Sequence, residues 1–137
     1  ESTQRDCTGH CDLEYEMNPI LTTADLAYIA GLFDGEGTAG VYQTSKRPSL
    51  RPQVCIAMTD RDPVMFIALC FGGNVYTCNS TKGSKKVYKW VRGNRLALDF
   101  AREVLPYCKN EYKVQQLETI TKHYTAQLAK LTQRYAL

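Results

Sequence analysis

The sequence predicts an α+β fold whose elements run in the order αββαββα, with a four-stranded antiparallel sheet that carries helices on one face. Two observations lead to this expectation. Apolar residues repeat at helical spacing in four segments, and pairs of short segments with period-two alternation lie between them. The 137 residues, 44% of them hydrophobic and 23% charged, suit one globular core. We therefore divide the chain into an N-terminal tail, 1–19, and a single domain, 20–137.

The first helix is predicted to begin after Thr22, which is a good N-cap, and Asp25 stands three residues later at the capping-box position. One face carries the apolar residues Leu26, Ile29, Ala30 and Phe33. Most other positions are apolar too, so the helix is expected to be buried on more than one side. The small residues Ala27, Ala30 and Gly31 would admit a second helix at close range.

Period-two runs predict strands at 38–42, 54–59, 75–79 and 86–91. Between the second and third strands, Asp62 is predicted to cap a helix that has Pro63 at its first position. Gly72 and Gly73 then end this helix.

Two further helices follow the sheet segments. Asn94 opens the first, whose buried face carries Ala97, Phe100, Ala101 and Val104. The last begins near Asn110 and continues its apolar pattern to Leu131. Coiled-coil pairing is an alternative for this helix, but we expect it to pack across the body because the pattern is short.

Charge is distributed unevenly along the chain. Residues 1–36 contain eight acidic residues and one basic residue, whereas residues 37–98 contain ten basic and two acidic residues. Between Pro63 and Leu98 there is no acidic residue at all. A basic block of this kind is typical of a surface that binds nucleic acid, and the alternative is a basic face exposed to water.

The N-terminus lacks the pattern of a secretory signal, which favours an intracellular location, and no run of about 18 apolar residues predicts a membrane span. Cys7, His10 and Cys11 form a cluster that has the ligand types of a zinc site but lacks a second cluster to complete it. The alternatives are free thiols or a disulfide of Cys7. The other cysteines sit singly in apolar segments and are predicted to be buried thiols: Cys55, Cys70, Cys78 and Cys108.

The first helix ends in a glycine-rich turn that holds two acids, Asp34 and Glu36, directly before a strand. The segment 29–37, Ile-Ala-Gly-Leu-Phe-Asp-Gly-Glu-Gly, resembles the signature of LAGLIDADG homing endonucleases, with conservative changes at its first, fifth, seventh and eighth positions. The alternative is a capped turn without chemistry. The resemblance implies a saddle-shaped sheet that binds DNA, and motif helices that pair at a dimer axis.

The resemblance also implies the residues of an active site. The Glu36 carboxylate and the Gly35 carbonyl match the ligands of a catalytic Mg²⁺. Mn²⁺ or Ca²⁺ could substitute for this ion. Asp60, after the second strand, matches a polar residue that organises water, although the family more often has an amide there. Lys113 best matches the catalytic lysine of a Lys-x-x-Gln segment, and Lys109 is the competing match because the spacing departs from the family pattern.

Strand alternation suggests which residues face DNA, because residues two apart share one face of a strand. Arg, Lys, Gln and Asn are residues that read base edges in the major groove. Arg61 is added as a phosphate contact beside the acids. The predicted DNA-binding residues are Thr38, Tyr42, Thr44, Lys46, Arg51, Gln53, Thr59, Arg61, Thr77, Asn79, Lys82, Lys85, Lys86 and Lys89.

Only one copy of the glycine-acid motif occurs in the 137 residues, so the chain is expected to supply half of a paired site and to act as a homodimer. The predicted dimer-interface residues are Ala27, Ala30, Gly31 and Asp34. The predicted function is site-specific, metal-dependent cleavage of both strands of a long, near-palindromic DNA site. The alternative is a non-cleaving regulator or an RNA intron maturase on the same fold.

Overall fold

The computed structural model describes residues 7–15, 21–44, 47–79 and 85–135. The strands are β1 (Cys7–Tyr15), β2 (Gly37–Thr44), β3 (Arg47–Met58), β4 (Gly73–Asn79) and β5 (Lys86–Gly93). The helices are α2 (Thr23–Glu36), α3 (Arg61–Phe71), α4 (Arg95–Val104) and α5 (Glu111–Tyr135), with a short 3-10 helix, η1 (Leu105–Tyr107).

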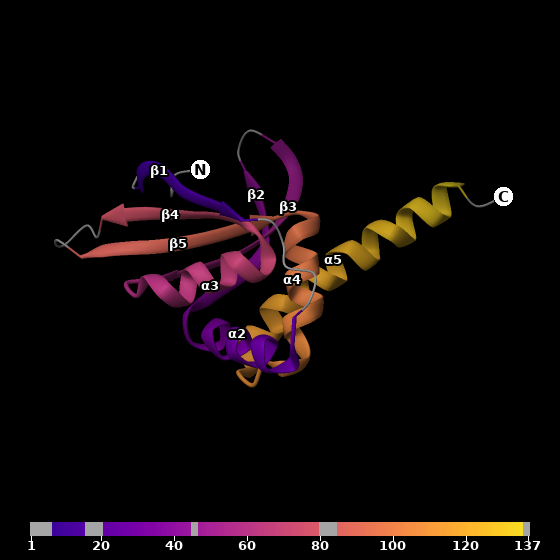
Figure 1. The fold of residues 1–137 in the computed structure, drawn as a ribbon. Coiled ribbons are helices and arrows are strands. Elements are labelled where there is room, and N and C mark those ends of the chain that lie inside the picture. The colour runs from indigo at the N-terminus through magenta and orange to yellow at the C-terminus, as the bar shows by residue number, and fades with distance from the viewer. Residues whose placement is uncertain (1–6, 16–20, 45–46, 80–84, 136–137) are drawn as a thin grey trace.

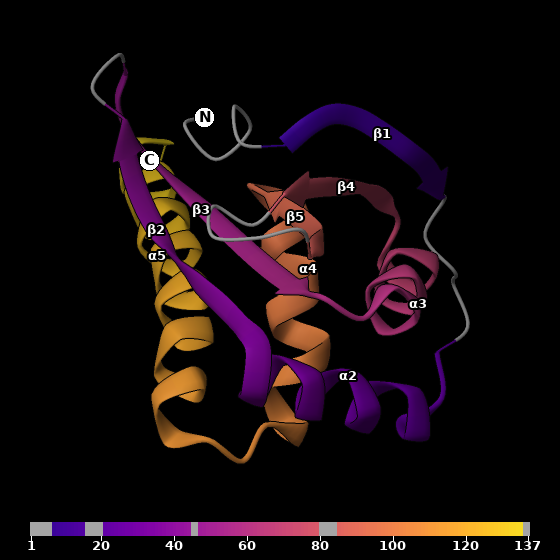
Figure 2. The same cartoon turned by 90° about the vertical axis from the view of Figure 1, so that its left-hand side faces the viewer.

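The strands form one antiparallel sheet in the order β1-β4-β5-β3-β2. Helices α2, α3 and α4 lie beneath the sheet in Figure 1. Figure 2 shows α5 running along β2 at one edge of the sheet, and β1 at the other edge. The predicted α+β class and the antiparallel sheet of β2 to β5 are therefore confirmed. No helix among the described residues is long and apolar enough to cross a membrane.

Strand β1 corrects the expected N-terminal tail, because Cys7–Tyr15 pairs with β4 as a fifth strand. The pairing is irregular between Cys7 and Cys11 and again between Cys11 and Leu13. Cys78, which was predicted to be a free thiol, is disulfide-bonded, and it lies opposite Cys7 in the strand register. The zinc prediction rests on the side chains of Cys7, His10 and Cys11, which the structure does not describe.

The core lies between the sheet and the helices. Val54, Ile56 and Trp90 project from the strands to this side, where each is fully buried. The ring centroid of Phe100 from α4 lies 5.3 Å from that of Trp90 and 5.8 Å from that of Phe33 in α2. Because successive residues of a strand face opposite sides, the residues between these buried positions define the other side of the sheet, which we call the open face.

The predicted start of α2 is confirmed in detail. The Asp25 backbone N–H donates to Thr22 Oγ1 at 3.0 Å, and the Thr22 N–H donates to Asp25 Oδ2 at 3.2 Å. The predicted cap of α3 is wrong, because that helix begins at Arg61 and its N-cap is Asp60 rather than Asp62. Asp60 makes no side-chain capping hydrogen bond, so its carboxylate is free for another role.

Helix α5 divides into two halves. Leu117 and Ile120 in the first half are fully buried in the core, as packing across the body predicts. Beyond Tyr124 the helix projects from the body (Figure 1), and Leu128 and Leu131 are 64% and 49% exposed. The expectation of packing across the body therefore holds only for the first half.

The junction of α2 and β2 leaves no room for a side chain at Gly37. A Cβ atom there would collide with the ring of Phe33, which is fully buried. We expect Gly37→Ala to lower the free energy of unfolding by about 1–3 kcal/mol through overpacking. Gly35→Ala is the control, because a Cβ at Gly35 meets nothing within 4 Å. Urea unfolding of the two variants would compare them, and equal stabilities would contradict this packing.

Candidate active site

Glu36 and Asp60 line the same cavity. Glu36 is the last residue of α2, and Asp60 precedes α3. Both residues are exposed, and among the described residues neither carboxylate has a hydrogen-bond or ion-pair partner. The cavity has a volume of about 260 Å³, and its lining residues are Glu36, Ala57, Met58, Thr59, Asp60 and Val87. Ala57 and Val87 belong to the open face, so the two acids lie at the end of that face.

The oxygen atoms of this cavity are suited to a hard divalent cation, which prefers carboxylate and carbonyl ligands. Gly35 lies in the last turn of α2, where backbone carbonyls lack donors from their own helix. Among the described residues, no group of three or more histidine, cysteine or acidic side chains is placed to hold a metal ion. Glu36, Gly35 and Asp60 could therefore supply part of the coordination set of such an ion.

Of the two competing lysines, Lys113 has a side-chain contact next to Glu36. Its ammonium group donates a hydrogen bond to the carbonyl of Gly37, the residue after Glu36. The same ammonium nitrogen lies 5.9 Å from the ring centroid of Phe33. Lys109 is exposed, and it contacts Asp34 through its backbone N–H rather than through its side chain. The geometry therefore favours Lys113 as the lysine of this site.

Asp34 is engaged inside its own subunit. Its Oδ2 atom accepts from the backbone N–H of Lys109 at 2.7 Å, which ties the end of α2 to the segment before α5. Burial, followed by the negative charge of Asp34 and a hydrogen bond to it, raises the pKa of the Cys108 thiol to about 12. These contacts join Asp34 to the segment before α5 within its own subunit, and its place at the dimer interface stays a prediction.

The open face combines polar and basic side chains from three strands. On β2 and β3, Tyr42 lies opposite Arg51, and Gly40 lies opposite Gln53. On β5, Lys89 lies opposite Ala57. Burial raises the pKa of the Cys55 thiol in the middle of this face, and the nearby Lys89 ammonium opposes that rise. The face therefore offers hydrogen-bonding groups around a thiol that stays protonated at neutral pH.

The predicted placement of Thr77 on this face is wrong. Thr77 lies opposite Tyr88, points to the helix side and is only 7% exposed. The alternation of β4 was assigned one residue out of phase, so Tyr76 rather than Thr77 shares the open face with Lys89. Asn79 lies two residues after Thr77 and therefore on the same side of the strand, but it is exposed because the strand ends there.

The other predicted DNA-binding residues divide into three groups. Thr38 and Thr59 are exposed near the acids, and Arg61 there forms a surface ion pair of 3.3 Å with Asp62. Lys85 and Lys86 are exposed at the start of β5. Lys46, Lys82 and the side chain of Thr44 lie outside the described part of the chain.

The outer face of α2 is open in the isolated subunit. Ala27 and Gly31 are exposed, and a Cβ atom at Gly31 would meet nothing within 4 Å. Ala30, which was predicted to share this face, is wrongly assigned because it is fully buried in the subunit's own core. The exposed strip of small residues on α2 therefore runs through Ala27, Gly31 and Gly35.

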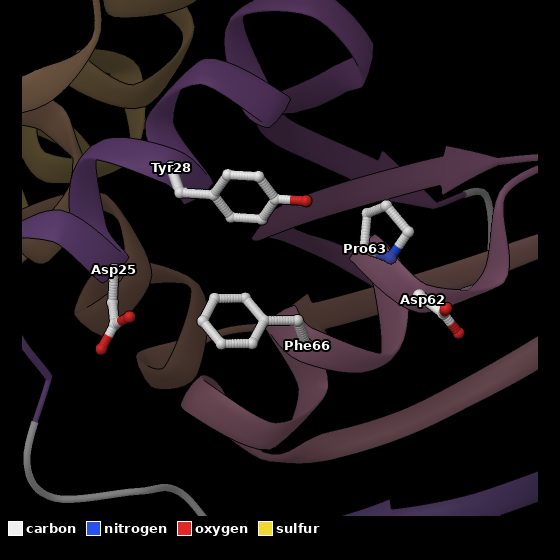
Figure 3. Close-up of a pocket in the computed structure, with 5 residues that line it drawn as sticks. All are labelled: Asp25, Tyr28, Asp62, Pro63 and Phe66. Carbon is white, nitrogen blue, oxygen red and sulfur yellow. The ribbon is translucent and has the colours of Figure 1, made fainter.

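A second cavity lies between α2 and α3. Figure 3 shows Tyr28 and Phe66 side by side in it, and their ring centroids lie 5.6 Å apart in an edge-to-face arrangement. Asp25, Asp62 and Pro63 complete its lining, and its volume is about 460 Å³. Tyr28 is 50% exposed, so this cavity extends the open surface of α2.

Comparison with known proteins gives one informative similarity. No family model matches the chain. Over 79 residues, the chain is 34% identical to the intron-encoded RNA maturase bI4 of Saccharomyces cerevisiae. The matched segment is 56% of this chain but only 12% of the maturase, so the chain corresponds to a small part of that protein.

Proposed function

We propose that this chain is the subunit of a homodimeric LAGLIDADG-type endonuclease that makes double-strand breaks in a long, near-palindromic DNA site. The observation that carries the proposal is the cavity shared by Glu36 and Asp60. It joins a motif acid to a second acid at the end of a basic and polar sheet face. A purely structural glycine turn would have no need for two unpaired carboxylates in one cavity.

The proposed cofactor is Mg²⁺, with Mn²⁺ or Ca²⁺ as substitutes. The Glu36 carboxylate and the Gly35 carbonyl would hold it. When bound, such an ion supplies positive charge that activates water and stabilises the attacking and leaving oxygens of a phosphodiester. The described residues of one subunit offer only part of a ligand set, which agrees with a site completed by phosphate oxygens and by a second subunit.

The chain's own residues take three roles in this proposal. Asp60 orients a water molecule in the cavity it shares with Glu36. Lys113 stabilises negative charge beside the carbonyl of Gly37. Side chains of the open face contact base edges and phosphates, and those with described positions are Thr38, Tyr42, Arg51, Gln53 and Lys89. Further contacts come from side chains at strand ends and beside the acids: Thr59, Arg61, Asn79, Lys85 and Lys86.

The second candidate function is RNA splicing as a maturase on the same fold, and the name of the yeast relative is the observation in its favour. The same open face would then bind RNA, and the two acids would have no cleavage to perform. Because the two functions are compatible with one surface, cleavage is the property that separates them.

The deciding experiment incubates the protein and Mg²⁺ with a randomised duplex DNA library and sequences the cut ends. We expect paired cuts on opposite strands, with short 3′ overhangs and a near-palindromic consensus. The control is chelation of the metal with EDTA, which should prevent all cleavage. If DNA is bound but no ends appear with Mg²⁺, Mn²⁺ or Ca²⁺, the endonuclease proposal fails and the maturase proposal is favoured.

A further inference from the structure

Strand β2 is an edge strand at the place where the candidate site is built. It pairs with β3 alone, so every second residue directs its backbone N–H and C=O groups away from the sheet. The first outward-directed groups after Glu36 are the carbonyl of Gly37 and the N–H of Ala39. Their position determines where the chain leaves α2 and therefore where the Glu36 carboxylate lies.

Two side chains of α5 form hydrogen bonds with these outward-directed backbone groups. The Lys113 ammonium donates to the carbonyl of Gly37, and Gln116 Oε1 accepts from the Ala39 N–H at 2.9 Å. Residues three apart lie on the same face of a helix, so one face of α5 presents both side chains to the strand. Together they supply the donor and the acceptor that one residue of a neighbouring strand would supply.

The first half of α5 is anchored to the body of the subunit. Leu117, the residue after Gln116, is fully buried, and so is Ile120 one turn later. At the other end, the first turn of α5 is capped by the Asn110 side chain, which accepts from the Tyr112 N–H at 2.9 Å. Because this half of α5 is anchored in the core, its side chains hold the strand edge in one place.

We propose that Gln116 is a positioning residue that sets the place of the Glu36 carboxylate by holding the Ala39 N–H. The inference rests on the proposed function, in which Glu36 binds the metal. Gln116 lies on α5 and holds a backbone group three residues beyond Glu36, so it acts through the strand. Its amide accepts this hydrogen bond without adding a negative charge next to Lys113.

Three variants separate this role from a general structural one. Gln116→Met keeps the length of the side chain and removes the acceptor, whereas Gln116→Glu keeps a side-chain oxygen that accepts from Ala39. Gln115→Met is the matched control, because Gln115 is the exposed neighbour on the same helix. Each variant is compared with wild type for amide hydrogen exchange at Ala39, for DNA affinity and for single-turnover cleavage of duplex DNA with Mg²⁺.

We expect Gln116→Met to accelerate exchange of the Ala39 amide by about tenfold. Cleavage should slow by about 10- to 100-fold, because small displacements of catalytic groups have effects of this size. DNA affinity should stay within about twofold, because Gln116 holds a backbone group of β2 and is not one of the side chains proposed to contact DNA. Gln116→Glu should keep the slow exchange of the Ala39 amide, and Gln115→Met should match wild type in all three measurements.

The outcomes distinguish this inference from the proposed function. If wild type cuts DNA and Gln116→Met cuts at the same rate, the positioning role is wrong while the endonuclease proposal stands. If wild type cuts no DNA, the endonuclease proposal fails, and so does the role of Gln116 in placing a catalytic acid. Unchanged exchange of the Ala39 amide in Gln116→Met would overturn the proposed hydrogen bond itself.

Discussion

Glu36→Gln is expected to abolish cleavage while DNA binding stays within about twofold of wild type. Glutamine keeps the size of glutamate but removes the charge that a divalent cation requires. The loss of a metal ligand should lower the single-turnover rate by at least about a thousandfold, since bound metals contribute several kcal/mol to such reactions. Glu36 is exposed and has no partner among the described residues, so the fold should not change.

The measurement is single-turnover cleavage of a selected duplex with Mg²⁺, together with DNA affinity in Ca²⁺. Asp62→Asn is the matched control, because Asp62 is an acid with a 93% exposed side chain outside the cavity of Glu36 and Asp60. It should cut at the wild-type rate. Cleavage by Glu36→Gln at that rate would mean that the ligand assignment is wrong.

The elements predicted best were those whose local and tertiary signals agree. The capping box of Thr22 and Asp25 and the glycines that end α3 are local features that the fold preserves. Gly72 and Gly73 have φ angles of +76° and +102°, which glycine adopts at little cost. Such positions are predictable because the chemistry of one or two adjacent residues decides the backbone.

Errors arose where only a distant segment decides the structure. Strand β1 exists because β4 offers a free edge, and an irregular pairing with bulges leaves no clean alternation in the sequence. The phase of β4 was ambiguous because Thr77 and Tyr76 both suit either face. The apolar pattern placed Ala30 on the face of Leu26, Ile29 and Phe33, which the fold buries. Its small size also suited a helix pair, so it was wrongly assigned to the interface.

The candidate site was predictable in its parts rather than in its assembly. Glu36, Asp60 and Lys113 were each suggested by the family resemblance, and the fold brings the two acids to one cavity. The link between Gln116 and Ala39 spans 77 positions of the chain, and no local pattern reports a side chain that holds a strand edge. The sequence signal for it was the Lys-x-x-Gln spacing, which places both side chains on one helix face.

Gly31→Leu is expected to disrupt the proposed dimer without damaging the subunit. A Cβ atom at Gly31 meets nothing within 4 Å, so a leucine has room in the isolated chain. Replacement of a glycine inside a helix should raise subunit stability by up to about 1 kcal/mol through helix propensity. In the dimer, the same side chain would stand between two α2 helices that approach along Ala27, Gly31 and Gly35.

Overpacking at that interface should cost about 1–3 kcal/mol, which weakens dimerisation by about 5- to 150-fold. Double-strand cleavage should fall more than DNA affinity, because two Glu36 carboxylates must stay near adjacent phosphates. Sedimentation equilibrium would measure the change, with Ala129→Leu on the exposed half of α5 as control. If wild type sediments as a monomer at micromolar concentration, or if Gly31→Leu dimerises as tightly as Ala129→Leu, α2 does not form the interface.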